Sequence, residues 1–169
     1  MKIPVFSALS AVLLSTKILW ADPITPVDLA PISHTDATLV VVGADGSETA
    51  YSPSQLEEFP TYSLTTATPW RDAPARFEGV LLADVLAAHG IREADAISVR
   101  AENDYSTVIP RVIWDSLDVL VATRVNGKPH TRRARGPIQF IIDMDAYTAS
   151  GDTTESNLVW MAARISAEQ

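Results

Sequence analysis

The sequence contains no cysteine, and this absence removes several kinds of chemistry at once. None of the 169 residues can form a disulfide, give a thiolate ligand to zinc or act as a thiol nucleophile. The folded protein therefore depends on its hydrophobic core, which a chain of this length is long enough to build.

Basic residues are scarce: 13 Lys and Arg face 21 Asp and Glu, for a formal net charge of −8. Without Lys2 and Lys17 of the first 21 residues, the balance becomes 11 basic against 21 acidic residues, a net charge of about −10. A surface of this sign repels nucleic acid and anionic lipid, so neither is expected as a partner.

A long hydrophobic run is also missing, although the N-terminus is apolar. Lys2 precedes the stretch "IPVFSALSAVLLS", and "ILWADP" offers a cleavage point after Ala21. This layout is typical of a secretory signal peptide over residues 1–21 and is too short for a comfortable membrane span. We expect a periplasmic or secreted protein without a membrane span after cleavage; an uncleaved N-terminal anchor is the alternative.

The remaining sequence predicts one domain. Residues 22–37 hold three prolines with little periodicity and are expected to form an extended leader. Residues 38–169 show no repeat and no break, so they form a single domain. Strand patterns alternate there with short helical ones, which predicts an α+β fold with a strand-rich mixed sheet, barrel-like at its core, and short helices.

Local patterns predict the individual elements. They indicate a hairpin over 38–52, a short helix over 52–59, a strand over 61–68, an irregular loop over 69–76, a helix over 81–89 ended by Gly90, strands over 96–103 and 105–110, a short helix over 111–117, a strand turning at Asn126–Gly127, and a strand over 136–143. The C-terminal segment reads as a helix over 154–161 followed by a strand through Ile165, with one continuous helix as the alternative.

Positive charge and aromatic side chains gather in two places on this acidic chain. The run "GKPHTRRARG" carries Lys128, Arg132, Arg133 and Arg135 between a turn and a strand, where guanidinium groups suit a phosphate or carboxylate. A solvated loop that balances the acidic body is the alternative.

The loop after the strand over 61–68 carries Trp70 and Arg71, and a flat ring beside a guanidinium suits a planar anionic ligand by stacking and ion pairing. A Trp that only covers the core is the other interpretation. Asn103 and Tyr105 lie in one turn, where turn formation explains the Asn first and ligand contact is a second use.

The sequence offers no metal site that residue spacing would support. The acidic segment 143–155 lacks the spacing of a calcium loop. His34, His89 and His130 share no metal-ligand spacing, and no serine lies in a Gly-x-Ser-x-Gly elbow. We therefore predict no metal site and name no catalytic residue.

The order of the motifs resembles the molybdopterin-binding domain of the sulfite oxidase family, especially small exported members. The matching elements are "SLTTATPW", "RFEGVLLADVLAAHGI", "ENDYSTVIP", "VLVATRVNGKPH", "RGPIQFII" and a final Trp-containing segment, which together span about residues 36–166. The resemblance implies a molybdopterin cofactor. It would place cofactor contacts at Thr66, Trp70, Arg71, Asn103, Tyr105, Lys128, Arg132, Arg133 and Arg135.

The chain departs from that family at its most important position. A cysteine near the end of the early strand supplies the family's thiolate to molybdenum, and residues 64–68 here are Leu, Thr, Thr, Ala and Thr. Gln139 and Val159 stand where the family's enzymes have cationic residues. Two hypotheses follow: an oxidoreductase-like protein that binds a pterin or another small anionic ligand without a thiolate–metal bond, or a non-catalytic periplasmic binding or sensing module with a protein partner.

Overall fold

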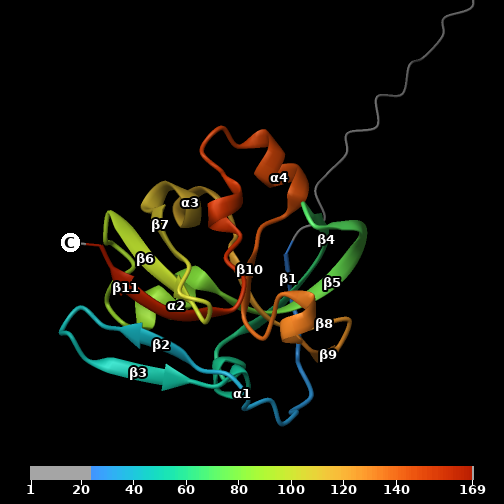
Figure 1. The fold of residues 1–169 in the computed structure, drawn as a ribbon, viewed down its shortest axis with the longest axis horizontal. Helices are drawn as coiled ribbons and strands as arrows, with labels where there is room; N and C mark the ends of the chain where they lie inside the picture. The colour runs from blue at the N-terminus through green and yellow to red at the C-terminus, as the bar shows by residue number, and fades with distance from the viewer. Residues whose placement is uncertain (1–23, 169) are drawn as a thin grey trace, which may run out of the picture.

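The computed structural model describes residues 24–168, which fold into two sheets with short helices around them (Figure 1). The expected signal peptide, residues 1–21, lies outside the described residues. Among the residues that are described, no helix has the length and apolar content to cross a membrane.

The first sheet is antiparallel and six-stranded. Its order is β1-β4-β5-β8-β10, with β9 paired to β8. The strands are β1 (Thr25–Pro26), β4 (Thr61–Thr68), β5 (Arg71–Leu81), β8 (Leu120–Val125), β9 (Lys128–Pro129) and β10 (Gln139–Ile141). The stretch expected to be an extended leader thus adds a short edge strand, while the domain limits at 22–37 and 38–169 stay a prediction.

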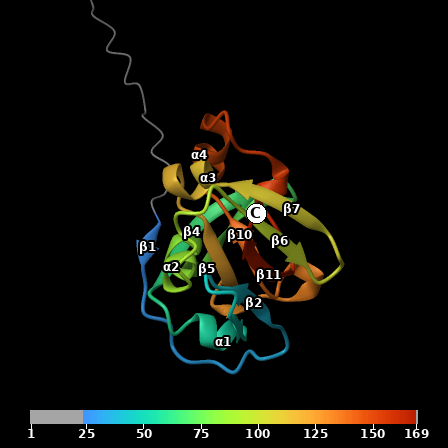
Figure 2. The same ribbon diagram turned by 90° about the vertical axis from the view of Figure 1, so that its left-hand side faces the viewer.

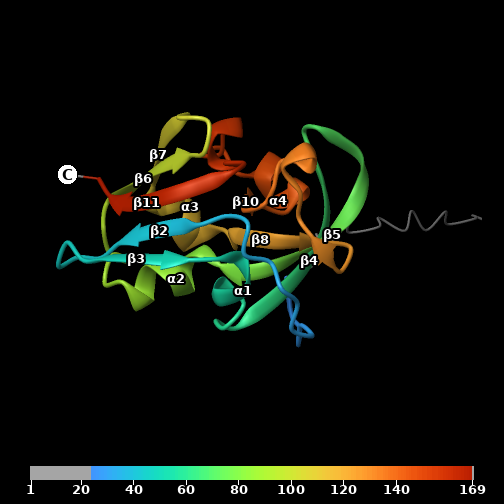
Figure 3. The same cartoon turned by 60° about the horizontal axis from the view of Figure 1, so that its bottom comes forward.

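The second sheet has five strands in the order β3-β2-β11-β6-β7. They are β3 (Glu48–Tyr51), β2 (Leu39–Val42), β11 (Ala162–Ala167), β6 (Ala96–Ala101) and β7 (Ser106–Pro110). β11 runs parallel to β2 and antiparallel to β6, so the sheet is mixed. Figure 3 shows this sheet on one side of the molecule and the long β4–β5 hairpin curving away on the other. The predicted α+β, strand-rich mixed fold is confirmed, although neither sheet closes into a barrel within residues 24–168.

Short helices fill the connections. They are α1 (Pro53–Leu56), α2 (Leu82–Ala88), α3 (Arg111–Ser116) and α4 (Met144–Ala149), with 3-10 turns η1 (Arg132–Ala134) and η2 (Glu155–Asn157). α1 begins as its sequence predicts, because Ser52 caps it and Gln55 completes a capping box. In Figure 2, α1 lies at one end of the molecule and α3 and α4 at the other.

The main core lies between the sheets and draws on β2, β5, α2, β6 and β11 through residues such as Leu39, Val80, Leu86, Val99 and Ile165. A second cluster lies on the other face of the first sheet. It consists of Leu64, Ala75, Phe77, Leu120, Ala122 and Ile141. The central strands of that sheet are therefore packed on both faces, which gives the site a rigid support.

Two expectations about local structure were wrong. The segment 69–76 is not an irregular loop: Pro69 and Trp70 form a tight turn, and β5 begins at Arg71 and pairs with Thr68. The C-terminal segment forms neither the helix over 154–161 nor a continuous helix, because only Glu155–Asn157 makes a 3-10 turn. The predicted strand through Ile165 is present as β11. The backbone N–H of Ala162 bonds the carbonyl of Ile138 instead of a helical neighbour.

Candidate functional site

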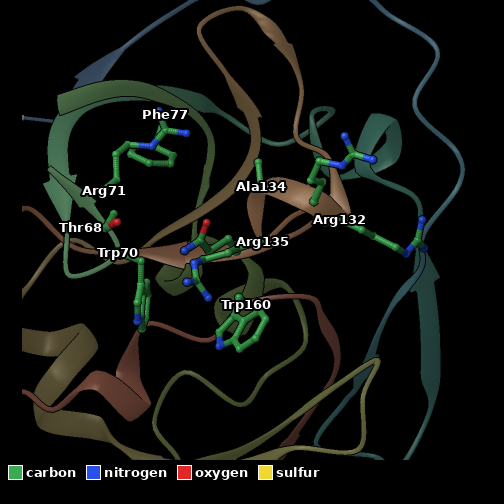
Figure 4. Close-up of a pocket in the computed structure, with 10 residues that line it drawn as sticks. Thr68, Trp70, Arg71, Phe77, Arg132, Ala134, Arg135 and Trp160 are labelled. Carbon is green, nitrogen blue, oxygen red and sulfur yellow. The ribbon is translucent and has the colours of Figure 1, made fainter. Parts of the chain in front are cut away.

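Three separate segments meet around a cavity of about 490 Å³ (Figure 4). The segments are the β4–β5 turn, the η1 loop and the stretch that leads into β11. Gln139, the first residue of β10, also lines the cavity. The cavity is lined by Thr68, Trp70, Arg71, Phe77, Arg132, Arg133, Ala134, Arg135, Gln139 and Trp160. The structure thus brings together the two basic and aromatic places that lie about sixty residues apart in the sequence, and we call this space the arginine pocket.

Arg135 lies between two indole rings inside the arginine pocket. Its guanidinium carbon is 4.6 Å from the centre of the Trp70 ring and 4.8 Å from that of Trp160. Figure 4 shows the two rings on either side of the guanidinium group. Both distances are within the range of a cation–π contact, so the Trp rings hold the cation in place.

The backbone around Arg135 is unusual. Arg135 ends η1 in the left-handed region with φ of 80°, which non-glycine residues adopt rarely. Its carbonyl accepts the backbone N–H of Met161 at 3.2 Å, and Met161 itself has φ of 55°. Because Met161 follows Trp160 directly, this backbone hydrogen bond fixes the position of Arg135 relative to Trp160. Strained backbone of this kind gathers at ligand sites and switches.

Arg132 fastens the η1 loop to the second sheet and to the chain before β2. Its Nε and one Nη donate to the two carboxylate oxygens of Glu102 at 2.7 and 2.8 Å. It also donates to the backbone carbonyl of Asp36 at 2.8 Å. The hydrogen bonds to Glu102 are the main reason that the pKa of Arg132 lies above its usual value. Arg132 borders the arginine pocket, but most of its donors already have partners.

Arg71, Arg133 and Arg135 differ from Arg132 in this respect. Among the residues that the structure describes, none of these three forms an ion pair with an acidic side chain. Three cations around one cavity, with no counter-ion among the side chains that the structure describes, make the cavity attractive to anions even though the chain as a whole is acidic.

Gln139 lines the arginine pocket and forms a buried polar pair with His130. His130 Nε2 and Gln139 Oε1 are 2.8 Å apart, and both residues are about 2% exposed. Gly136 packs so closely on His130 that a Cβ there would lie 2.6 Å from the His130 backbone carbon. Burial lowers the pKa of His130, and the charge of Arg71 lowers it further, while the bond to Gln139 opposes the shift. His130 is therefore a neutral imidazole at pH 7.

Thr66, a predicted cofactor contact, is not part of the lining of the arginine pocket. It is buried, and its Oγ1 accepts the backbone N–H of Met144 at 2.9 Å, where α4 begins. The residue of β4 that lines the arginine pocket is Thr68. Thr66 thus holds α4 against β4.

Asn103 and Tyr105 line a neighbouring cavity of about 380 Å³. Trp70 and Trp160 border both cavities, so the two spaces adjoin along the indole rings. Asn103 Oδ1 also accepts the Tyr105 N–H at 3.3 Å, as its expected role in the turn requires. Lys128 lies exposed in β9 and is not part of the lining of either cavity.

Sequence reasoning did not select five of the lining residues, namely Thr68, Phe77, Ala134, Gln139 and Trp160. Two of them carry a local signal, because Gln139 and Trp160 fall where the resembling family has a cation or an aromatic residue. Phe77 reads as an ordinary core residue, and nothing in its neighbourhood in the sequence distinguishes it.

Within residues 24–168, no group of three or more His, Cys, Asp or Glu side chains is arranged to hold a metal ion. The arrangement that is present suits binding, orientation and charge neutralisation of an anion.

Comparison with known proteins gives two findings. The model of the oxidoreductase molybdopterin binding domain family matches residues 26–149. The fold is similar to that of the sulfane dehydrogenase SoxCD from Paracoccus pantotrophus, with a TM-score of 0.59 and 15% sequence identity. That match covers 80% of this chain but 39% of the SoxCD chain. No curated protein sequence matches this chain.

Proposed function

Since this chain belongs to the family of oxidoreductase molybdopterin-binding domains, we propose that it is an exported ligand-binding member that holds a small anionic ligand in the arginine pocket. The family makes a phosphorylated pterin the first ligand to consider, and a related anion is the second. The observation that carries the proposal is the meeting of Arg71, Arg133 and Arg135 around one cavity with two Trp rings.

The donor atoms of this chain do not fit molybdenum held by a thiolate. The sequence has no cysteine, and the threonine hydroxyls of β4 are poor substitutes for a soft anionic ligand. The oxygen of Thr66 already accepts a backbone hydrogen bond from α4. We therefore propose ligand binding without a thiolate–metal bond and derive no redox step for this chain.

The residues of the arginine pocket have distinct roles in this proposal. Arg71 and Arg133 neutralise the anion, and Arg135 donates charge-assisted hydrogen bonds, which are about twice as strong as neutral ones. Thr68 adds a hydroxyl, and the contact with His130 holds Gln139 in place. The walls of Trp70 and Trp160 keep part of the bound anion away from water, which strengthens each of these contacts.

The test is to purify the protein from its native export route under cofactor-replete conditions and to analyse what it carries. Oxidised extracts are examined for pterin fluorescence and for small anions by mass spectrometry, and molybdenum is measured by elemental analysis. A pterin or another anion near one per protein, with molybdenum far below that ratio, supports the proposal. Molybdenum at one per protein, or no anion in the extract and none taken up on titration, contradicts it.

A second candidate function is a binding or sensing module that presents its ligand state to a periplasmic protein partner. A specific surface favours it: the exposed large hydrophobic side chains among the described residues, Tyr105, Val108 and Val112, lie on and beside β7, the last strand of the second sheet. Co-purification of wild type and V108K/V112K from native cells tests this function. A partner that the double variant loses supports it, and an identical set of proteins with both contradicts it.

A further inference from the structure

The space between Trp70 and Trp160 is already filled by a side chain of the protein itself. Building on the proposed anion site, we propose that Arg135 is its specificity-determining residue. Its guanidinium group excludes flat aromatic rings from the gap between the two indoles and offers its N–H edge to the oxygens of a carboxylate or phosphate.

The first argument is the geometry of the gap. The guanidinium carbon lies 4.6 Å from one ring centre and 4.8 Å from the other. A guanidinium is planar and stacks on aromatic faces, as a heteroaromatic ring does. The guanidinium group of Arg135 thus fills the space between the two indole rings. A pterin or purine ring cannot stack there unless Arg135 leaves.

The second argument concerns the donors of Arg135. A guanidinium has five N–H donors, all directed outward in its own plane. Because an indole ring lies on either side of the guanidinium group, we expect a ligand to contact its N–H groups and not to stack on it. Among the residues that the structure describes, no acceptor for the side-chain donors of Arg135 is present. An edge with parallel N–H groups matches the paired oxygens of a carboxylate or phosphate.

The third argument is that the protein holds Arg135 in this position. The residue has φ of 80°, its N–H bonds the carbonyl of Arg132 at 3.1 Å, and its carbonyl accepts the N–H of Met161. These backbone hydrogen bonds therefore connect Arg135 to the rest of the η1 loop and to the segment that carries Trp160. In this arrangement Trp70 contacts Arg135, and stacking of Trp70 on a planar ligand stays a prediction.

The experiment compares wild type with R135G, R135K and R133A. Glycine suits the positive φ at position 135, so R135G opens the gap without adding backbone strain. R135K keeps the charge and loses the plane. R133A is the matched control, because it removes a cation from the same loop and leaves the indole gap filled. Circular dichroism and thermal melting confirm that each variant is folded.

Two probes are titrated calorimetrically and by Trp fluorescence: inorganic phosphate, and an uncharged pterin that carries no phosphate or carboxylate. We expect R135G to bind the uncharged pterin about tenfold more tightly than wild type and to lose phosphate affinity by about tenfold or more. R135K should lose less phosphate affinity than R135G, and R133A should not gain pterin binding.

Two results overturn this inference. One is uncharged-pterin binding by R135G that is no tighter than binding by wild type. The other is an equal gain of pterin binding in R133A. Failure of wild type to bind phosphate or any other anion would instead contradict the proposed function. In that case, tighter binding of the uncharged pterin by R135G alone would still support the role of Arg135.

Discussion

Met161 donates its backbone N–H to the carbonyl oxygen of Arg135 across 3.2 Å, and both residues have a positive φ. The bond joins the η1 loop to the segment that carries Trp160, so the cation and one of its aromatic neighbours are positioned by the same backbone contact. Left-handed backbone at two non-glycine residues has an energetic cost, which the rest of the fold must offset.

The first prediction concerns this strained pair. M161V places a β-branched side chain at φ of 55°, which is a poor conformation for valine. We expect the free energy of unfolding to fall by about 1–2 kcal/mol and phosphate binding to weaken, because Trp160 and Arg135 shift together. M161N is the control, since Asn tolerates left-handed backbone. Equal stability of the two variants in urea unfolding would contradict the prediction.

The second prediction separates the cations. R71E reverses a charge in the arginine pocket and should lower anion affinity by about tenfold or more, with little change in melting temperature. K128E makes the same reversal in exposed β9, outside the lining of both cavities, and should change affinity by less than about twofold at moderate salt. Calorimetric titration with phosphate compares them. Equal losses would mean that the net charge, and not the arginine pocket, controls binding.

The third prediction concerns Thr66. T66V removes the oxygen that accepts the Met144 N–H and leaves that donor without a partner in a partly buried place. The expected cost is about 1–2 kcal/mol of unfolding free energy, with unchanged anion affinity. T66S keeps the hydroxyl and should retain most of the stability. A large loss of anion binding in T66V, at unchanged stability, would place Thr66 in the ligand site.

The fourth prediction is a pH dependence from His130. Its pKa in the folded protein lies below the ordinary value of 6.5, chiefly because the ring is buried. Between the two values the unfolded chain binds more protons, so stability falls as pH falls through about 6.5 and levels off below the lowered folded pKa. Wild type should therefore lose more unfolding free energy between pH 7 and pH 5 than H130Q does. Parallel losses in the two proteins would exclude this role of His130.

The sequence predicts those elements whose ends are marked by capping or turn residues. Ser52 with Gln55 predicts the start of α1, and Asn126–Gly127 predicts the β8–β9 turn that the structure shows with positive φ at both residues. The basic run and Trp70–Arg71 were identified as a site because both are exceptional in an acidic chain. That these two segments lie side by side could not be predicted from the sequence around either one. Their proximity depends on how β4, β5 and β10 are arranged in the first sheet.

Other features depend on partners far away in the chain. β5 was missed because Pro74 and three charged residues occur early in it, yet residues 71–76 pair with β4 alone, and pairing with β8 begins at Phe77. A proline is tolerated where one side of a strand is unpaired. The apolar run around Leu158 and Val159 suits a helix or a buried extended segment equally well. Backbone bonds to Ile138 and Phe140 decide between the two.

The most direct test of an anion site at Arg135 is nuclear magnetic resonance of the protein labelled with ¹⁵N-arginine. The Nε–H signal of Arg135 is assigned by its absence in R135G and should be shifted upfield by the two indole rings. On addition of phosphate, we predict a saturable downfield change of this signal. A signal that stays in place while phosphate saturates the protein would contradict the account.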